Sequence, residues 1–165
     1  MRRPQLKTLL WSVLLAMSLG MGACSGDDCP INNTVQGKMA FYSQHGEALA
    51  VGGTLTVAVV RPQGDSVVLN QKDAASEVLF PLSYAHDTDT LILIFNNTSG
   101  TARDSLYVAH TNTPTLVSVD CGTAMFHSIT TVGCTHHVID TLILKSPEVD
   151  YDERENIQII CHIGD

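Results

Sequence analysis

Five histidines in the second half of the chain are the side chains best suited to metal or acid–base chemistry: His110, His127, His136, His137 and His162. A zinc site needs three or four ligands that converge, and the spacing of these five matches no known zinc pattern. Neighbouring residues on a strand point to opposite faces, so His136 and His137 would not share one metal. We therefore expect hydrogen-bonded core or surface histidines, with no metal site and no cofactor.

The densest acidic run, Asp150–Glu155, carries oxygen atoms of the kind that bind Ca²⁺. It lacks the glycine and the ligand periodicity of an EF-hand loop, so we expect a solvated loop before the last strand. A metal-binding or hydrolytic site that combines His110 and His127 with this loop is the alternative.

Patterns for nucleophilic catalysis and for sugar stacking are weak. No G-x-S-x-G setting surrounds a serine, so we assign no catalytic residue among Ser105, Ser118 and Ser128. Aromatic residues make up only 5% of the chain, which leaves a poor basis for a carbohydrate platform on Tyr42, Tyr84, Tyr107 and Tyr151. The residue types therefore favour a binding role over catalysis.

The first 23 residues have the organisation of a signal peptide. A basic segment, Met1–Lys7, precedes the uncharged apolar segment Thr8–Gly20, which is too short to span a bilayer. Met21–Cys24 resembles the lipobox of bacterial lipoproteins, although Met21 stands where leucine is usual. We expect cleavage before Cys24 and acylation of its thiol, with diacylglycerol and palmitate, and no transmembrane helix. An ordinary signal peptide before an unmodified Cys24 is the alternative.

A short acidic segment, Ser25–Asp28, follows the acylated cysteine. It resembles the surface-export signal of lipoproteins of Bacteroidota, and the alternative is a plain solvated tether. We therefore expect an outer-membrane lipoprotein that is surface-exposed or faces the periplasm. The expected organisation is a signal peptide over 1–23, a lipidated cysteine and tether over 24–35, and one domain over 36–165.

The charge balance restricts the partners. The chain has 9 basic and 17 acidic residues, and Arg2, Arg3 and Lys7 leave with the leader. Such an excess of acid repels phosphate backbones and provides no polybasic attraction to anionic lipids. We therefore expect no nucleic-acid binding, membrane attachment through the lipid anchor alone, and an envelope protein as the partner of a non-enzymatic interaction module.

Four cysteines remain after acylation of Cys24, in an oxidising compartment where disulfides persist. Four cysteines allow three pairings, and spacing alone does not choose among them. We favour Cys29–Cys121, which would tie the tether to the body, and Cys134–Cys161, which would join two late strands. Each bridge would contribute about 2–4 kcal/mol of stability.

The rest of the chain predicts an all-β fold. Short β-branched runs alternate with turns rich in Gly, Pro, Asn and Asp, and no long helical period occurs. This pattern is typical of an antiparallel β-sandwich with Ig-like proportions, and a small antiparallel barrel is the alternative. We expect a turn at Asn112–Pro114, and strands at Gly37–Tyr42, Thr54–Val60, Ser66–Leu69, Glu77–Pro81, Thr90–Phe95, Ser105–His110, Thr115–Val119, His137–Leu144 and Asn156–His162.

A short pattern recurs four times in the chain: an Asp, then a hydroxyl residue, then an aliphatic residue. The hydroxyl residues are Ser66, Thr90, Ser105 and Thr141. Asp closes a turn well, so the repeat has a mechanical explanation. The triplet also resembles the O-glycosylation acceptor of exported proteins of Bacteroidota. Both interpretations stay open, and both can hold at one site.

Several motifs together resemble an uncharacterised family of small β-rich lipoproteins of gut Bacteroidota. They cover nearly the whole chain after Cys24, and Cys134 and Cys161 lie outside the family pattern. The resemblance implies a lipoprotein and brings no activity with it. The motifs are Asp28-Cys29-Pro30, Thr54–Asn70, Pro81–Tyr84, His110–His127 and Asp150–Ile157.

Overall fold

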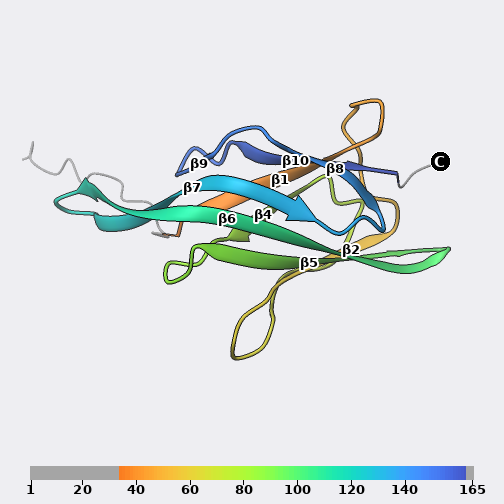
Figure 1. The fold of residues 1–165 in the computed structure, drawn as a ribbon, viewed down its shortest axis with the longest axis horizontal. Helices are drawn as coiled ribbons and strands as arrows, with labels where there is room; N and C mark the ends of the chain where they lie inside the picture. The colour runs from red at the N-terminus through yellow and green to blue at the C-terminus, as the bar shows by residue number, and fades with distance from the viewer. Residues whose placement is uncertain (1–33, 163–165) are drawn as a thin grey trace, which may run out of the picture.

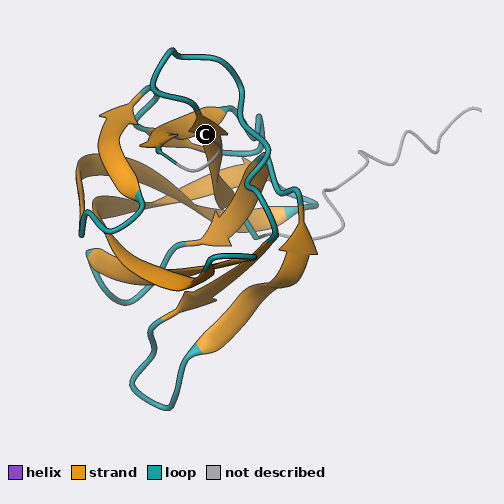
Figure 2. Cartoon of the chain, turned by 90° about the vertical axis from the view of Figure 1, so that its right-hand side faces the viewer, coloured by secondary structure: helices purple, strands orange, loops and turns teal. Residues whose placement is uncertain are grey.

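A computed structural model describes residues 34–162 of the protein, and the predicted leader, Cys24 and Cys29 lie outside this range. Within it, two β-sheets face each other as a sandwich, and the fold is all-β as predicted (Figures 1 and 2). The smaller sheet has the order β4 (Glu77–Pro81), β1 (Gln36–Tyr42), β10 (Glu155–Cys161), β8 (Ile139–Leu144). The larger has the order β3 (Ser66–Asp73), β2 (Thr54–Val59), β5 (Thr88–Asn97), β6 (Gly100–Ser118), β7 (Gly122–Cys134), β9 (Glu148–Val149).

One strand pair departs from the expected antiparallel pattern. β1 and β10 run parallel, with Phe41 opposite Ile159, so the first and last strands lie side by side within the smaller sheet. Every other pairing between named strands is antiparallel. Parallel neighbours need a long connection, and here all of β2–β9 lies between them in the chain. This pair joins the two ends of the domain.

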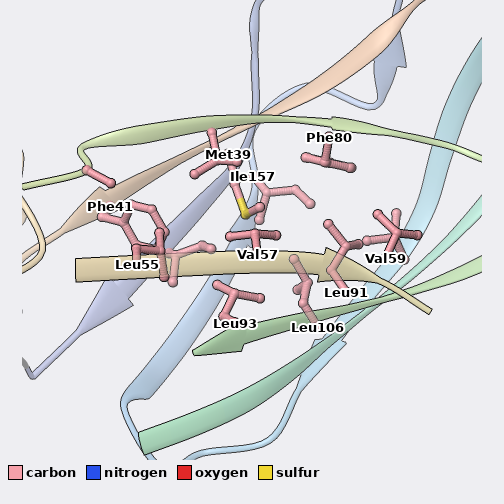
Figure 3. Close-up of a cluster of buried hydrophobic side chains, with 14 of the residues drawn as sticks. Met39, Phe41, Leu55, Val57, Val59, Phe80, Leu91, Leu93, Leu106 and Ile157 are labelled. Atoms are coloured by element: carbon pink, nitrogen blue, oxygen red, sulfur yellow. The ribbon is translucent and has the colours of Figure 1, made fainter. Parts of the chain in front are cut away.

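The core lies between the sheets and follows from strand alternation. β1 alternates half-buried and buried residues, which places Met39 and Phe41 inside. Figure 3 shows them facing the side chains of β2, among them Leu55 and Val57. Phe41 also meets Phe95 of β5 edge to face, with ring centroids 6.4 Å apart. Burial of such side chains, at about 25 cal/mol per Å² of apolar surface, is the main force that holds the sheets together.

Two strand predictions were wrong in the same region. Asn112–Pro114 was expected to be a turn, but β6 runs straight through it, and the expected strands on either side form one element. Proline has no backbone N–H to donate to a neighbouring strand. Pro114 is tolerated because the pairing of β6 with β5 ends at Ala109, before Pro114 is reached. β7 was not predicted, since its sequence is rich in small and polar residues and shows no clean alternation.

The outer part of the β6–β7 hairpin has no further strand beside it among the described residues. β9 pairs with β7 only at His127 and Ser128. Pro114–Ser118 and Gly122–Met125 therefore pair only with each other, and we call this two-stranded ribbon the β6–β7 arm. Figure 1 shows it extending past the ends of the neighbouring strands. In residues 34–162, no helix is long and apolar enough to cross a membrane.

Candidate functional site

Three polar side chains of β6 and β7 meet in the interior because of strand register. His110 and Asn112 are two residues apart on β6 and share a face, and His127 of β7 lies directly opposite Asn112. His110 and His127 are both 2% exposed, and their rings meet edge to face with centroids 5.2 Å apart. The histidines named from sequence as the alternative site are thus brought together, with Asn112 between them.

Hydrogen bonds fix the proton positions in this cluster. The Asn112 Nδ2 donates to the carbonyl oxygen of His86 at 3.0 Å, which orients the amide. Its Oδ1 must then accept, and it lies 2.9 Å from Nδ1 of His110 and 2.7 Å from Nδ1 of His127. Both imidazoles therefore carry a hydrogen on Nδ1.

Asp89, at the start of β5, is the anion of the cluster. Its Oδ2 lies 3.1 Å from Nε2 of His110 and accepts the backbone N–H of Ser83 at 2.6 Å. Its Oδ1 accepts from the guanidinium of Arg61, which follows β2. Both ring nitrogens of His110 thus face acceptors, Oδ1 of Asn112 at Nδ1 and Oδ2 of Asp89 at Nε2.

His127 differs from His110 in that one of its nitrogens has no partner. Its Nε2 is buried and makes no hydrogen bond within the described residues. Burial, reinforced by the charge of His110 and opposed by that of Asp89, lowers the pKa of His127 to about 4. At neutral pH this nitrogen is therefore a bare lone pair, able to accept a hydrogen bond.

Tyr84 forms the outer wall of the cluster. Its ring stacks on His127, with centroids 5.7 Å apart and planes 21° apart, and the residue is 50% exposed. Tyr84 also lines an open pocket of about 360 Å³, together with Thr34, Arg61, Pro81–Ser83 and Ala85. The pocket thus shares Arg61, Ser83 and Tyr84 with the buried cluster.

The hydroxyl of Ser83, beside this pocket, has a structural role. It accepts the backbone N–H groups of Ala85 and His86, at 3.3 and 3.2 Å, and so closes a turn. Among the described residues, neither ring nitrogen of His127 hydrogen-bonds to a hydroxyl.

The acidic loop is internally bonded. Asp150 and Asp152 both accept hydrogen bonds from Arg154, and Glu155 accepts from the Tyr42 hydroxyl at 2.7 Å. The loop follows Val149, the strand partner of His127. Oε1 of Glu155 is buried and has no hydrogen-bond partner among the described residues. Across residues 34–162, no group of three His, Cys, Asp or Glu side chains is placed to hold a metal ion.

A second buried carboxylate, Asp104 of β6, holds the connection between β7 and β8. It accepts the Thr135 hydroxyl at 2.6 Å and the backbone N–H groups of His137, Val138 and Ile139 at 2.7–3.0 Å. Burial opposes the charge, but these donors outweigh it and lower the pKa of Asp104 to about 2. His137 also contacts Asp104, through Nδ1 at 3.1 Å. His136 lies in the same connection and bonds through Nδ1 to the carbonyl of Ile139. His162 follows β10 and bonds through Nδ1 to Asp140.

The predicted Cys134–Cys161 bridge is absent, because both residues are free thiols. The Sγ of Cys134 lies 3.8 Å from Nδ1 of His136. Burial is the main cause that raises the pKa of the Cys161 thiol to about 12. A thiol with so high a pKa forms little thiolate, the species that attacks in disulfide exchange. Because Cys29 lies outside the described residues, the Cys29–Cys121 pairing stays a prediction.

The four Asp-hydroxyl-aliphatic triplets fall into two groups. Asp89 is buried and accepts the N–H of Ser83 in the preceding turn, so the mechanical interpretation fits the triplet of Thr90. Asp104 lies inside β6 and bonds to the connection between β7 and β8, so it closes no turn before Ser105. Ser66 and Thr141 are exposed, and O-glycosylation stays a prediction for them.

Sequence reasoning found His110 and His127 but missed Asn112, Asp89 and Arg61. The alternation His110-x-Asn112 on one strand was the available signal for Asn112. The contacts with Asp89 and Arg61 depend on long-range strand register, which sequence does not display.

The comparisons with known proteins identify the chain at the level of a family. No curated protein and no solved structure matches it. One family model does match, over residues 54–161, which is more than half of the chain and extends from the start of β2 to the end of β10. The chain therefore belongs to the family of unknown function DUF6452.

Proposed function

We propose that this protein is an outer-membrane lipoprotein, held by an acylated Cys24, whose domain binds another envelope protein without catalysis. The order of basic segment, apolar segment and small residues before Cys24 supports the anchor. The resemblance to lipoproteins of Bacteroidota agrees with it. The excess of acidic residues argues against nucleic acid as the partner.

The observation that carries the binding role is the β6–β7 arm. An isolated two-stranded ribbon is marginally stable in water and presents unpaired backbone N–H and C=O groups along its edges. Near its tip, Leu116 is 66% exposed and Val119 is 92% exposed. Aliphatic side chains this exposed gain free energy when a partner covers them.

The arm fits one mode of recognition best, the addition of a strand. An extended segment of the partner would pair with the free edge of the arm and bury its apolar tip. The partner we infer is therefore an envelope protein that offers an extended, partly apolar segment.

Site-specific photocrosslinking in intact cells tests this role. A photoreactive amino acid replaces Val119, and the matched control replaces Val67, which is 57% exposed on the edge strand β3. We expect one identified envelope protein to crosslink through position 119 and not through position 67. Equal capture at both positions, or none at 119, would contradict the role of the arm.

The anchor is tested separately. Intact-mass measurement of the membrane-extracted protein should show a chain that begins at Cys24 and carries acyl groups, and Cys24→Ala should release it from the membrane. A Cys24→Ala chain that stays membrane-bound would refute the anchor. Protease treatment of intact cells then distinguishes a surface-exposed domain from one that faces the periplasm.

A further inference from the structure

We propose that the partner strand pairs with the β7 edge of the arm rather than the β6 edge, and that the partner segment is apolar with lysine or arginine at both ends. This inference rests on the proposed binding role of the arm, and it adds which edge is used and which segment chemistry fits. It follows from the direction of the backbone groups, from Pro114, and from the charges beside the free edge.

The backbone groups of β7 alternate between its two sides. The N–H of Ile129 donates to the carbonyl oxygen of Pro147 at 2.8 Å, on the side away from β6. In an antiparallel strand every second residue directs both its N–H and its C=O to the same side. The pairing with β6 is regular below Ile129, so Met125 and Thr123 also direct these groups away from β6. β9 ends before Met125 is reached, so within residues 34–162 no strand pairs with them.

The β6 edge of the arm lacks a donor at its middle. His110 donates its N–H to the carbonyl oxygen of Asp87 at 2.8 Å, which places the outward groups of β6 at His110 and at every second residue after it. The outward residues of the arm are therefore Pro114 and Leu116, since the register with β7 is regular between them. Proline has no N–H, so this edge offers an interrupted ladder to an added strand. The β7 edge keeps every donor and acceptor.

Apolar side chains flank the free edge of β7 on both faces. Ala124 is buried, and Phe126 on the same face packs against the core and meets the ring of Tyr151 edge to face, with centroids 5.4 Å apart. Met125 lies on the other face, which it shares with Leu116 of β6. An added strand places its side chains alternately against these two faces. Apolar or β-branched residues at successive positions would therefore gain contacts on both sides.

The charges beside this edge are acidic at both ends. The loop after β9 carries Asp150, Asp152 and Glu153 with a single base, Arg154, which bonds to the two aspartates. The tip of the arm carries the exposed Asp120. The hairpin between residues 111 and 134 contains no lysine or arginine. Charge complementarity therefore favours a segment with a basic residue at each end, and an acidic segment would be repelled.

Three synthetic peptides test the segment chemistry. The first is acetyl-Lys-Lys-Val-Thr-Val-Ile-Lys-Lys-amide, the second has glutamate in place of every lysine, and the third has proline in place of threonine. Each is titrated at low ionic strength into the full chain in detergent micelles, and two-dimensional NMR follows the backbone amides. We expect saturable shifts at Thr123 and Met125 with the first peptide, about 10-fold weaker binding of the second, and no saturation with the third.

Proline substitutions in intact cells test the choice of edge. Met125→Pro removes an outward N–H from β7, and Leu116→Pro is the matched control that removes one from β6. Both leave the hydrogen bonds between β6 and β7 in place, and each is compared with the alanine variant at the same position, which keeps the N–H. With the photoreactive residue at position 119, we expect Met125→Pro to capture about 10-fold less partner than Met125→Ala, and Leu116→Pro to equal Leu116→Ala.

The outcomes separate this inference from the role of the arm. Equal capture by Met125→Pro and Met125→Ala, or a loss confined to Leu116→Pro, would overturn the assignment to β7 while the arm still binds. Equal binding of the lysine and glutamate peptides, or no saturation with the lysine peptide, would overturn the segment chemistry. No capture at position 119 in the otherwise unsubstituted chain would instead refute the binding role itself. Unchanged amide spectra of the smaller sheet show that each variant is folded.

Discussion

Asp89 and Asp104 begin the same kind of sequence triplet and are both buried, yet their surroundings differ in kind. Asp104 takes three backbone N–H groups and the Thr135 hydroxyl, all from one short connection. Asp89 contacts the backbone N–H of Ser83 and the side chains of Arg61 and His110, which come from three different parts of the chain.

The difference separates a structural carboxylate from one that belongs to a site. Backbone donors cannot move away without unfolding the segment, so Asp104 fastens the β7–β8 connection to β6 and has no acceptor capacity to spare. Side-chain donors can re-orient, and those of Asp89 border a pocket and an unpartnered nitrogen. A buried acid with side-chain partners beside unused polar capacity is therefore the better indicator of a binding site.

The largest expected effect concerns the two aspartates. Asp104→Asn places an NH₂ group against backbone donors, and we expect the free energy of unfolding to fall by about 3 kcal/mol or more. Asp89→Asn should cost less, about 1–2 kcal/mol, because Arg61 can turn to solvent and one backbone N–H, that of Ser83, donates to Asp89 where three donate to Asp104. Urea denaturation of both variants measures the two values.

An equal loss of unfolding free energy in Asp104→Asn and Asp89→Asn would contradict the proposed difference between the two carboxylates. Asp140→Asn serves as the control, because Asp140 bonds only to the side chains of Gln44 and His162 in exposed positions, and it should lose less than 1 kcal/mol.

The second effect is a stability loss in two separate pH windows. The pKa of His127 is lowered, so the unfolded chain binds a proton that the folded chain does not. Stability should therefore fall as pH decreases from about 6.5 to about 4, by at most about 1.4 kcal/mol per pH unit. The pKa of Asp104 is also lowered, so its contribution is present above about pH 4 and is lost as pH falls toward 2.

Chemical denaturation at a series of pH values separates the two windows. His127→Phe should flatten the upper window only, and Asp104→Asn the lower window only. If His127→Phe leaves the slope between pH 6.5 and 4 unchanged, another group causes it.

The sequence predicted the architecture well, for a physical reason. Alternation of aliphatic and polar residues in β1 and β2 reports burial on one face, and turns rich in Gly and Asp report where strands end. β7 was missed because alternation is weak in a strand whose partners change along its length. Asn112–Pro114 was taken for a turn because its residue types favour turns, while the long pairing of the hairpin overrides that preference.

Less of the site was predictable. His110 and His127 drew attention as residue types, but their meeting depends on the β6–β7 register, and Asp89 and Arg61 come from other strands. The Cys134–Cys161 bridge was predicted from their positions on late strands, although disulfide formation also requires a reactive thiolate and a fitting geometry.

The smallest expected effect on stability, and the sharpest test of the comparison, is Tyr84→Ala. Tyr84 is half exposed, so its loss should cost under about 1 kcal/mol. The same change uncovers one face of the His127 ring and lets water approach it, which weakens the burial that lowers the pKa of this ring. We therefore expect the pKa of His127 to rise from about 4 toward its ordinary value, as measured by NMR titration of the ring nitrogens. Tyr107→Ala is the matched control, because Tyr107 lies on β6 and is 45% exposed. The aromatic rings in contact with His127 among the described residues are those of Tyr84 and His110. Tyr107→Ala should therefore leave the pKa of His127 unchanged. If the pKa of His127 stays near 4 in Tyr84→Ala, other side chains keep the His127 ring buried. The cluster would then be as closed to ligands as the surroundings of Asp104.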